Sequence, residues 1–566
     1  MNLKPESDYM RKHLGKLLLI LNCLCIVFGV CYINIKYYSG TWNVFGVILT
    51  AALVGNFLLV YINNIVLIKK NHKEIRVIRI LGYIYLINNI FAMLGMMIGN
   101  ITLSNSYFNS LEDDKYVYTL IYLSYFSIFI FGMVLSCLST ANFKDENNYN
   151  KKVDRGRILK KIFKIICYIV LIFGVFFSWI ILTRHDIRNI EVYTVGFSVF
   201  FGFIFCSNLI ILLSLKVKDK NTKIYYFVST IGTVVVAICI LSFVLTPYTI
   251  KKCEKEFSEA FGKEWREKID KNHKKYLLKT PFCVPAYFLG IDSHNFVVKK
   301  DIMFYKGIDN NQKEVKLYFD VYMPKKLDNN LPGIGTCIIR IHGGAWVAGD
   351  KGEMNMLQMN KYFAGQGYTV FDIQYGLSNS SSFTLELGEE EHVKGNFNID
   401  DMLKHIGIFT KYLERNAEKY GVDLDSVFIS GGSAGGHLST ATALAINSGR
   451  YNNIFSSKIK ISGIIPFYPA NGLSALGEIG GREDFVNPIS LVEKNSPPCL
   501  IYQGTRDSLV PIELSENLKN KYTSKRNKRC AIMRMPLGGH GSDYYFSGQY
   551  NQVFLYYMER FIYIYK

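Results

Sequence analysis

The sequence predicts an all-α membrane domain of seven helices, followed by a domain of the α/β class with a mostly parallel sheet and helices on both faces. Two patterns support this. Residues 17–249 contain long uncharged apolar runs, and residues 296–566 alternate between short apolar strands and amphipathic helices. The chain has 566 residues, enough for two or three domains. We therefore expect a membrane domain at 1–249, a charged juxtamembrane or cap segment at 250–295, and a globular domain at 296–566.

Seven segments are long enough to cross a bilayer, which takes about 20 apolar residues. They are 17–35, 44–68, 80–100, 116–139, 165–183, 192–215 and 225–248, and none contains Asp, Glu, Lys, Arg or His. Seven such runs in series argue against buried helices of a soluble protein. Six spans after the first argue against a cleavable signal peptide. Polar residues inside them, such as Asn56 and Asn63, are expected to join helices by hydrogen bonds, which favours an anchor or scaffold over a transporter.

Cations in the short loops predict the orientation. The N-terminal tail and the second, fourth and sixth loops carry about 20 Lys and Arg residues, and the alternate loops carry four. Loops rich in Lys and Arg stay in the cytoplasm, so an odd number of spans puts residues 250–566 outside. Lys251 and Lys252, directly after the last span, are at odds with this orientation. Because the net charge of +19 lies largely in these loops, it indicates a lipid bilayer as partner and no nucleic acid.

The segment 250–280 is charged, with scattered aromatic residues. It is interpreted as an amphipathic helix on the membrane surface, a cap over the following domain, or a solvated helix face. Beyond it, alternation predicts strands at 296–305, 315–324, 336–341, 368–375, 426–430, 460–468, 498–504 and 531–536. Helices are predicted at 353–367, 398–421, 434–447, 511–524 and 550–564. Functional residues of such a domain lie beyond the carboxyl ends of its strands.

The stretch FISGGSAGGHLS, residues 428–439, places Ser433 where a strand turns sharply into a helix. A G-x-S-x-G match has little meaning alone, but this context is that of a nucleophile on a strained elbow. Side chains two positions before and two after would collide, which explains Gly431 and Gly435. The helix that begins at Ala434 directs its free N–H groups at the same place. The alternative is a plain glycine-rich turn, which requires no serine.

A serine hydroxyl needs a base, and the base needs a carboxylate that orients it. His540, in PLGGHGSD, is the histidine that stands on a loop directly after a predicted strand. Asp507, in IYQGTRDSLVP, follows the preceding strand and is the predicted acid. Asp543 is the competitor, but it lies three residues from His540 on one loop, which is poor geometry for orienting that ring. His437 is expected to pack on the nucleophile helix.

The stretch RIHGGAW follows the strand at 336–341 and suits an oxyanion hole. Two glycines let the backbone approach a substrate closely and direct N–H groups inwards. Gly343 and Gly344, with the N–H of Ala434, are the expected donors. His342 is expected to brace this loop. Trp346 is expected either to line the acyl pocket or simply to pack.

Four motifs in this order, HGGAWVAGDK, GGSAGGHLS, PPCLIYQGTRDSLVP and GGHG, resemble the hormone-sensitive-lipase-like and acetyl-esterase branch of the α/β-hydrolases. They also resemble the isoprenylcysteine methylesterase and kynurenine formamidase relatives. The resemblance covers residues 296–566 and implies an α/β-hydrolase fold with a Ser–His–Asp triad. It does not specify a substrate. The third glycine that is frequent in the family's oxyanion loop is Ala345 here, which leaves the two main donors in place.

Together these features predict a membrane-anchored serine hydrolase that cleaves carboxylic esters. The expected substrates are short acyl or acetyl esters of a lipid or an envelope glycan. No cofactor is implied. The twelve cysteines show no CxxC and no metal-type spacing with histidine. Insertions at 377–396 and 471–486 are candidate lids. The alternatives are an acyltransferase with the same triad, a peptidase of the prolyl-oligopeptidase type, and a receptor with an inactive hydrolase domain.

Overall fold

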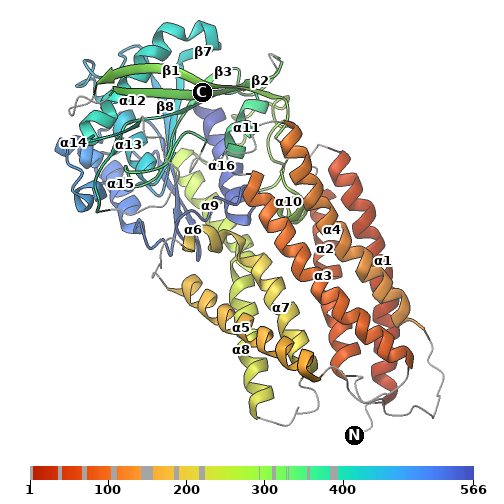
Figure 1. Cartoon of the computed structure of the whole chain (residues 1–566). Helices are drawn as coiled ribbons and strands as arrows, with labels where there is room; N and C mark the ends of the chain where they lie inside the picture. Colours follow the sequence, from red (N-terminus) through yellow and green to blue (C-terminus); the bar gives the residue numbers. More distant parts are fainter. Residues whose placement is uncertain are drawn as a thin grey trace.

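The computed structural model describes most of the chain, and the ranges are 4–35, 41–66, 73–103, 111–141, 157–183, 190–215, 223–291, 293–308, 314–326, 328, 330–352, 357–382 and 393–566. The molecule has two parts (Figure 1). Helices from the first half of the sequence form one part, and the sheet with its helices forms the other. The N-terminus lies at the end of the helical part that is far from the sheet.

Seven helices in the described ranges are long and apolar enough to cross a membrane, as predicted. The helical elements are α1 (Lys4–Asn34), α2 (Thr41–Tyr61) with the π-helix η1 (Ile62–Val66), α3 (Lys73–Leu103), α4 (Leu111–Ser139), α5 (Arg157–Leu182), α6 (Ile190–Thr194), the 3₁₀ turn η2 (Val195–Phe197), α7 (Ser198–Leu215), α8 (Lys223–Val244) and α9 (Thr246–Phe261). Short α6 and η2 lead directly into α7 and form the sixth candidate span with it. The seventh runs through α8 and α9.

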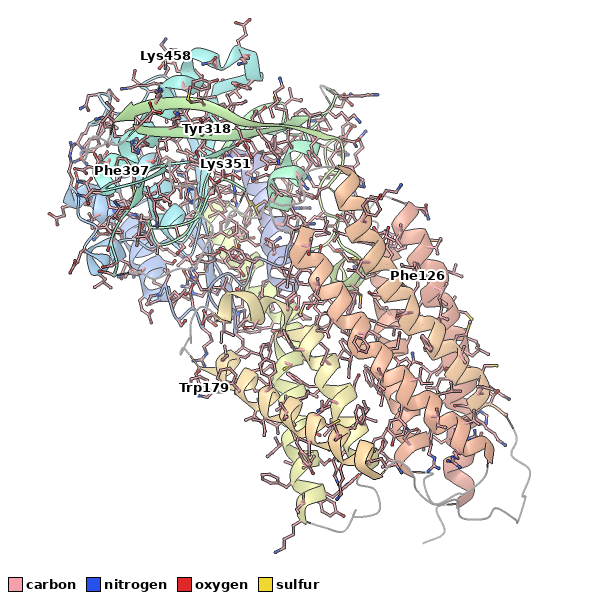
Figure 2. All side chains as sticks on the ribbon, in the orientation of Figure 1. Phe126, Trp179, Tyr318, Lys351, Phe397 and Lys458 are labelled. Atoms are coloured by element: carbon pink, nitrogen blue, oxygen red, sulfur yellow. The ribbon has the colours of Figure 1, made fainter. Side chains whose placement is uncertain are left out.

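The outer surface of these helices is apolar. Val47, Ile172 and Phe91 are exposed by 70%, 69% and 68%. Figure 2 places Phe126 and Trp179 in the helical part, and Tyr318 and Lys351 in the sheet part. A soluble monomer rarely exposes contiguous apolar surface of this kind, whereas lipid tails cover it without cost. The helical part is therefore compatible with a multi-pass membrane protein.

Polar side chains inside the helical part bond one helix to another, as predicted. Asn56 donates to Asn22 over 2.8 Å, and Asn22 donates back over 3.0 Å, which joins α2 to α1. Asn63 donates to Ser139 over 3.1 Å. Asn89 on α3 donates to Ser207 on α7 over 3.0 Å. Such bonds stabilise a bundle by about 0.6–2 kcal/mol each, so these groups act as structural contacts between spans.

The second part is built on an eight-stranded sheet in the order β1-β2-β4-β3-β7-β8-β9-β10. Its strands are β1 (Phe296–Ile308), β2 (Glu314–Pro324), β3 (Gly335–Ile341), β4 (Thr369–Ile373), β7 (Val422–Gly432), β8 (Ile461–Phe467), β9 (Cys499–Gly504) and β10 (Cys530–Met535). All eight predicted strands are present. Strand β2 is antiparallel to both of its neighbours, and the pairs from β4 to β10 are parallel.

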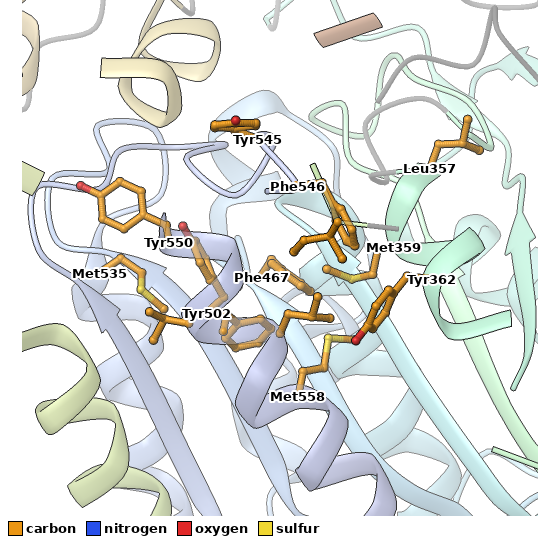
Figure 3. Close-up of a cluster of buried hydrophobic side chains, with 14 of the residues drawn as sticks. Leu357, Met359, Tyr362, Phe467, Tyr502, Met535, Tyr545, Phe546, Tyr550 and Met558 are labelled. Carbon is orange, nitrogen blue, oxygen red and sulfur yellow. The ribbon is translucent and has the colours of Figure 1, made fainter. Parts of the chain in front are cut away.

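The helices that accompany the sheet are α10 (Val284–Leu289), α11 (Leu357–Gly365), α12 (Ile399–Asn416), α13 (Ala434–Ser448), α14 (Glu483–Val486), α15 (Ile512–Ser524) and α16 (Gln549–Tyr565). Helices α11, α12, α13, α15 and α16 correspond to the five predicted ones, whose residues 353–356 lie outside the described ranges, and the short α10 and α14 were not predicted. Figure 3 shows part of the core, a cluster of buried side chains to which Met558 of α16, Phe467 of β8 and Tyr502 of β9 belong. The Phe554 ring of α16 lies 4.9 Å from that of Phe467. Because α16 is buried along nearly its whole length, the last helix is central to the domain.

The segment after the last span packs on the sheet. Helix α9 continues α8 beyond Leu245 and lies against β10, the edge strand. The Glu256 carboxylate accepts a hydrogen bond from the backbone N–H of Ile532 over 3.1 Å. The Phe257 ring lies 5.3 Å from that of Tyr557 on α16. Helix α9, the first part of 250–280, therefore packs on the edge strand and on α16. An unpaired edge strand is a site of aggregation, and α9 covers this one.

The two parts are in direct contact at several further points. Tyr32 of α1 donates to the carbonyl of Gly290 over 3.1 Å. Gln549, the first residue of α16, donates to Ser242 of α8 over 3.1 Å. The Tyr545 ring stacks on Phe197, with ring centroids 4.8 Å apart. In Figure 3 Tyr545 lies at the margin of the sheet core, close to the helical part.

Candidate active site

Ser433 stands at the sharp turn between β7 and α13, as predicted. Its backbone angles are φ 56° and ψ −119°, in a region that residues other than glycine rarely adopt. A Cβ atom at Gly431 would lie 2.4 Å from the carbonyl oxygen of Ile341, and one at Gly435 would lie 2.1 Å from the same atom. Only glycine fits at these two positions, so the local sequence dictates the elbow. Ser433 is partly exposed, and its N–H donates to Phe467 over 3.0 Å.

His540 and Asp507 lie side by side on the loops that follow β10 and β9. Nδ1 of His540 is 3.0 Å and 3.1 Å from the two carboxylate oxygens of Asp507. Asp507 is itself held by the backbone N–H groups of Leu509 at 3.0 Å and Val510 at 2.7 Å. Because Nδ1 faces Asp507, Nε2 is the ring nitrogen left to meet a substrate or a serine. The competitor Asp543 interacts instead with Tyr468 and makes no hydrogen bond to the His540 ring in the described part.

Tyr468 connects the elbow with the His540 loop. Its ring centroid lies 4.3 Å from that of His540. A Cβ atom at Gly432 would be 3.4 Å from the same tyrosine ring. Between the described residues Ser433 and His540 no hydrogen bond is formed, and such bonds are commonly long before substrate binds. The structure thus brings Asp507 and His540 into contact and sets Ser433 nearby, at the same edge of the sheet.

Two opposed effects determine the pKa of His540. Burial lowers it, but the neighbouring carboxylates of Asp507, Glu191 and Asp543 raise it by more, so the pKa of His540 is above its ordinary value. The charged imidazolium is therefore stabilised in place. A base of this kind is active only at pH values above its pKa.

The glycine loop after β3 lies against the elbow. A Cβ atom at Gly343 would be 3.0 Å from the carbonyl oxygen of Gly432 and 3.6 Å from Cβ of Ser433. Gly344, Ala345 and Trp346 have φ values of 110°, 49° and 63°, so the backbone runs through three successive left-handed residues. Positive φ is strained in residues other than glycine, so Ala345 and Trp346 mark this loop as a constrained segment beside the elbow.

His342 and His437 brace this region. The His342 ring stacks on Tyr375 at 4.3 Å, and its Nδ1 lies 2.8 Å from the carbonyl oxygen of Gly343. Trp346 donates from Nε1 to Nδ1 of His437 over 3.2 Å, and Nε2 of His437 lies 2.8 Å from the carbonyl oxygen of Phe485. Both histidines are fully buried. Each has the supporting position that the sequence predicts.

The two predicted insertions meet each other. Residues 383–392 of the insertion 377–396 lie outside the described residues. In its described part, Ser380 donates from Oγ to the carbonyl oxygen of Gly477 over 2.6 Å. The second insertion, 471–486, contains a 3₁₀ turn (Leu473–Gly477) and α14. A lid function for either insertion remains a prediction.

Glu191 also belongs to the site, although no sequence motif marks it. It belongs to α6 in the helical part, and it is 2% exposed. Its Oε1 accepts hydrogen bonds from the backbone N–H of Ser508 over 3.2 Å and from that of His540. No spacing rule connects residues more than 300 positions apart, and an acidic residue at the start of an apolar run is ordinarily interfacial. No pattern in the sequence could have revealed this contact.

Within the described ranges, no group of three or more His, Cys, Asp or Glu side chains has the arrangement of a metal site. Asp507 and Glu191, two of the buried carboxylates beside His540, accept hydrogen bonds from backbone N–H groups.

Comparisons with known proteins agree with this architecture. The BD-FAE family model matches residues 319–522. The probable carboxylic ester hydrolase LipM of Mycobacterium tuberculosis is 23% identical over 249 residues, which cover 40% of this chain and 53% of LipM. Esterase LipC of the same organism is 23% identical over 229 residues, which cover 36% of this chain and 53% of LipC. The chain thus spans about half the length of these curated relatives.

Solved structures of esterases are also similar to this chain. Esterase B from Lactobacillus rhamnosis is 20% identical, with a TM-score of 0.35, over 44% of this chain and 81% of its own. Esterase 2 from Thermogutta terrifontis is 23% identical, with a TM-score of 0.36, and the match covers 48% of this chain and 92% of that esterase. On its strand order and its elbow, the C-terminal domain has the α/β-hydrolase fold, is similar in part of its sequence to the BD-FAE family and to curated esterases, and is joined to seven apolar helices.

Proposed function

We propose that the chain is a membrane-anchored serine hydrolase that cleaves carboxylic esters through Ser433, His540 and Asp507. One observation carries the proposal. His540 holds Asp507 at 3.0 Å through Nδ1, while Ser433 stands on a strained elbow at the same edge of the sheet. This is the spatial order of nucleophile, base and orienting acid that acyl transfer to a serine needs. The names of the relatives LipM and LipC, a probable carboxylic ester hydrolase and an esterase, support it.

In the first half-reaction, Ser433 Oγ attacks the ester carbonyl and Nε2 of His540 takes the hydroxyl proton. The tetrahedral oxyanion accepts hydrogen bonds from backbone N–H groups, for which Gly343, Gly344 and Ala434 are the candidates. Such donors lower the barrier by about 3–4 kcal/mol each. Asp507 stabilises the imidazolium and holds its tautomer. The imidazolium then protonates the leaving alcohol oxygen as the C–O bond breaks, and an acyl-Ser433 ester remains.

In the second half-reaction, His540 removes a proton from a water molecule, and the hydroxide attacks the acyl carbonyl. The second tetrahedral intermediate uses the same N–H donors. Its collapse breaks the bond to Ser433 Oγ, which regains its proton from His540, and the carboxylic acid leaves. An acceptor alcohol in place of water would give transesterification, so hydrolysis and acyl transfer share every residue up to this step.

The location of the site favours an ester carried by a lipid or by a lipid-linked glycan. The His540 loop contacts Glu191, which lies where the sixth candidate span begins. The reacting ester then has to reach the level at which the helices leave the bilayer. Leu476 and Leu509 lie on segments after β8 and β9, and they are exposed by 76% and 41%. Apolar side chains at this edge suit an acyl chain.

The same proposal puts the hydrolase domain outside the cytoplasmic membrane. The sheet part lies at the end of the helices remote from the N-terminus (Figure 1), and the cation-rich loops belong to the N-terminal end of the bundle by helix count. Positive loops remain in the cytoplasm, which supports an external site and substrates in the envelope or medium.

Purified full-length protein in lipid nanodiscs provides the test. A fluorophosphonate should label Ser433, and short acyl esters should be hydrolysed to acid and alcohol. Product analysis with an added acceptor alcohol separates hydrolysis from acyl transfer. A matched peptide amide tests the peptidase alternative. Absence of both labelling and ester turnover in folded protein would contradict the proposal.

A further inference from the structure

Glu191 joins the two loops that carry the proposed acid and base. Its Oε1 accepts from the N–H of Ser508, the residue after Asp507, and from the N–H of His540 itself. One carboxylate oxygen therefore fixes the backbone of both loops. The carboxylate also crosses from the helical part to the sheet part, since α6 belongs to the segment that leads into α7.

The segment around Glu191 fits closely over the His540 loop. A Cβ atom at Gly539 would lie 2.7 Å from Oε1 of Glu191, and one at Gly541 would lie 2.9 Å from Cγ1 of Val192. A Cβ atom at Gly196 would lie 3.1 Å from the carbonyl oxygen of Ser542. The glycines on both sides of His540 thus leave room for α6, and the backbone of this loop lies directly against the helical part.

We propose that Glu191 is a positioning residue, supplied by the membrane-type helical domain, that sets the placement of His540 relative to Asp507. The inference rests on the proposed function. It assigns part of the catalytic arrangement to a residue more than 100 positions before the hydrolase domain begins. The carboxylate touches neither Ser433 nor the ester, and it acts through the backbone of the two loops.

Two physical effects make Glu191 suited to this role. A neutral amide in place of the carboxylate weakens both hydrogen bonds, because a hydrogen bond to a charged group contributes about 1.5–3 kcal/mol and one to a neutral group about 0.5–1.5 kcal/mol. The loops are then held less firmly, and a displacement of about 1 Å at a catalytic group can lower the rate about 100-fold. The second effect is charge, because an anion near His540 favours its protonated form.

Among the described residues, three carboxylates and one tyrosine ring face His540. Asp507 comes from the loop after β9, Glu191 from α6, Asp543 from the same loop as His540, and Tyr468 from the segment after β8. Of these, Glu191 is supplied by the helical part. Neutralising it should lower the pKa of His540, while Asp507 continues to orient the ring. The acid limb of the activity profile then moves to lower pH.

Glu256 offers a matched control. It also belongs to the segment that precedes the hydrolase domain, and its carboxylate also accepts a backbone N–H from that domain, that of Ile532 on β10. It differs from Glu191 in its backbone partner, because Ile532 lies within β10 and not on either triad loop. A carboxylate that merely joins the two parts would behave as Glu256 does.

The test uses the full-length chain in nanodiscs, with wild type, Glu191→Gln, Glu191→Asp and Glu256→Gln. The readouts are kcat and KM for p-nitrophenyl butyrate and the rate of fluorophosphonate labelling at Ser433, each as a function of pH. Glu191→Gln should lower kcat about tenfold with KM within about twofold, and should move the acid limb to lower pH. Glu191→Asp retains the charge with a shorter reach, so kcat should fall while the acid limb stays in place. Glu256→Gln should leave both kcat and the pH of the acid limb unchanged.

Wild-type kcat and an unmoved acid limb in folded Glu191→Gln and Glu191→Asp would overturn the inference while leaving the proposed function intact. An equal loss of kcat in Glu256→Gln would also overturn it, because the effect would then come from docking alone. If the wild type neither hydrolyses the ester nor labels at Ser433, the proposed function fails and takes this inference with it.

Discussion

Ser433, His540 and Asp507 differ in exposure, and the difference suits their proposed roles. Ser433 is partly exposed at the elbow, whereas His540 and Asp507 are 3% and 2% exposed. A nucleophile has to meet its substrate, while a base and its carboxylate interact more strongly where water is excluded. The carboxylate is further fixed by two backbone N–H groups, so the acid is held before any substrate arrives.

Removal of the nucleophile is the first test at this scale. Ser433→Ala should lower kcat for short acyl esters by about 10³-fold or more, because the covalent step is lost. Thermal unfolding and gel filtration should match wild type, and fluorophosphonate labelling should vanish. Turnover near the wild-type rate in a clean preparation would remove Ser433 from the mechanism.

The orienting carboxylate can be identified by comparing two substitutions. Asp507→Asn should lower kcat by about 10²–10⁴-fold, since an amide favours the wrong tautomer of His540. Asp543→Asn should cost far less, because Asp543 faces Tyr468. Steady-state kinetics on both variants give the ranking, and the reverse order would transfer the role to Asp543.

Burial raises the pKa of Asp543 to about 6, and its Oδ1 is buried with no hydrogen-bond partner. The folded protein therefore holds a proton that the unfolded chain releases near pH 4. This contribution to stability is complete below that pH and is lost as the pH rises through about 6. Asp543→Asn should remove this loss and raise the free energy of unfolding at neutral pH relative to wild type, by an amount of the order of 3 kcal/mol. Thermal unfolding of both proteins across this pH range measures it. An identical pH dependence of the two proteins would contradict the assignment.

At the scale of elements, α9 is the most informative, because one helix both continues the last candidate span and covers the edge of the sheet. Apolar alternation at 531–536 identifies β10, but no pattern in that strand states whether it is an edge. The partner of its free N–H at Ile532 is a carboxylate from residue 256. The connection from the helical part thus stabilises the sheet directly.

Glu256→Ala should lower the free energy of unfolding by about 1–3 kcal/mol, since it leaves the Ile532 N–H unpaired and removes the ion partner of Lys519. Glu259→Ala is the control, because the Glu259–Lys255 pair on the same helix is exposed and such pairs contribute little. Chemical denaturation in detergent compares the two variants. Equal effects would show that the contact between Glu256 and the edge strand does not stabilise the domain.

Elements with a strong local pattern were predictable from the sequence. The seven apolar runs, the eight strands and the turn at Ser433 all follow from periodicity, length and glycine spacing, and Asp507 and His540 follow from their places after strands. What the sequence analysis misses depends on contacts between distant segments. Glu191 reaches His540, and Glu256 reaches Ile532, across separations that no local pattern encodes. The short helix α6 also precedes α7 inside what looks like one apolar run.

At the scale of the whole molecule, the hydrolase part and the helical part form a continuous structure. Helix α8 leads into α9, α6 lies over the His540 loop, and Tyr545 stacks on Phe197. The two parts are joined by buried aromatic contacts and buried hydrogen bonds at several separate points. Such an interface restrains the two parts relative to each other, unlike a flexible linker.

The proposed orientation is tested on cells. Protease added to intact spheroplasts should cleave the hydrolase domain, because the loop cations predict residues 250–566 on the outside. Immunoblotting against each end of the chain locates the cleavage, and lysed spheroplasts serve as the control. Full protection until lysis would put the domain in the cytoplasm and would favour an ester of the inner leaflet as substrate.

The contacts that join the two parts of the molecule at several points have a kinetic consequence. In the proposed membrane-anchored protein they hold Ser433 at one fixed height above the bilayer, so the site meets only esters that reach this height. Its substrates then arrive by lateral diffusion. For a lipid ester, the turnover rate should follow the mole fraction of that ester in the membrane and stay constant when more vesicles of the same composition are added. An ester dissolved in the medium would instead follow ordinary bulk concentration.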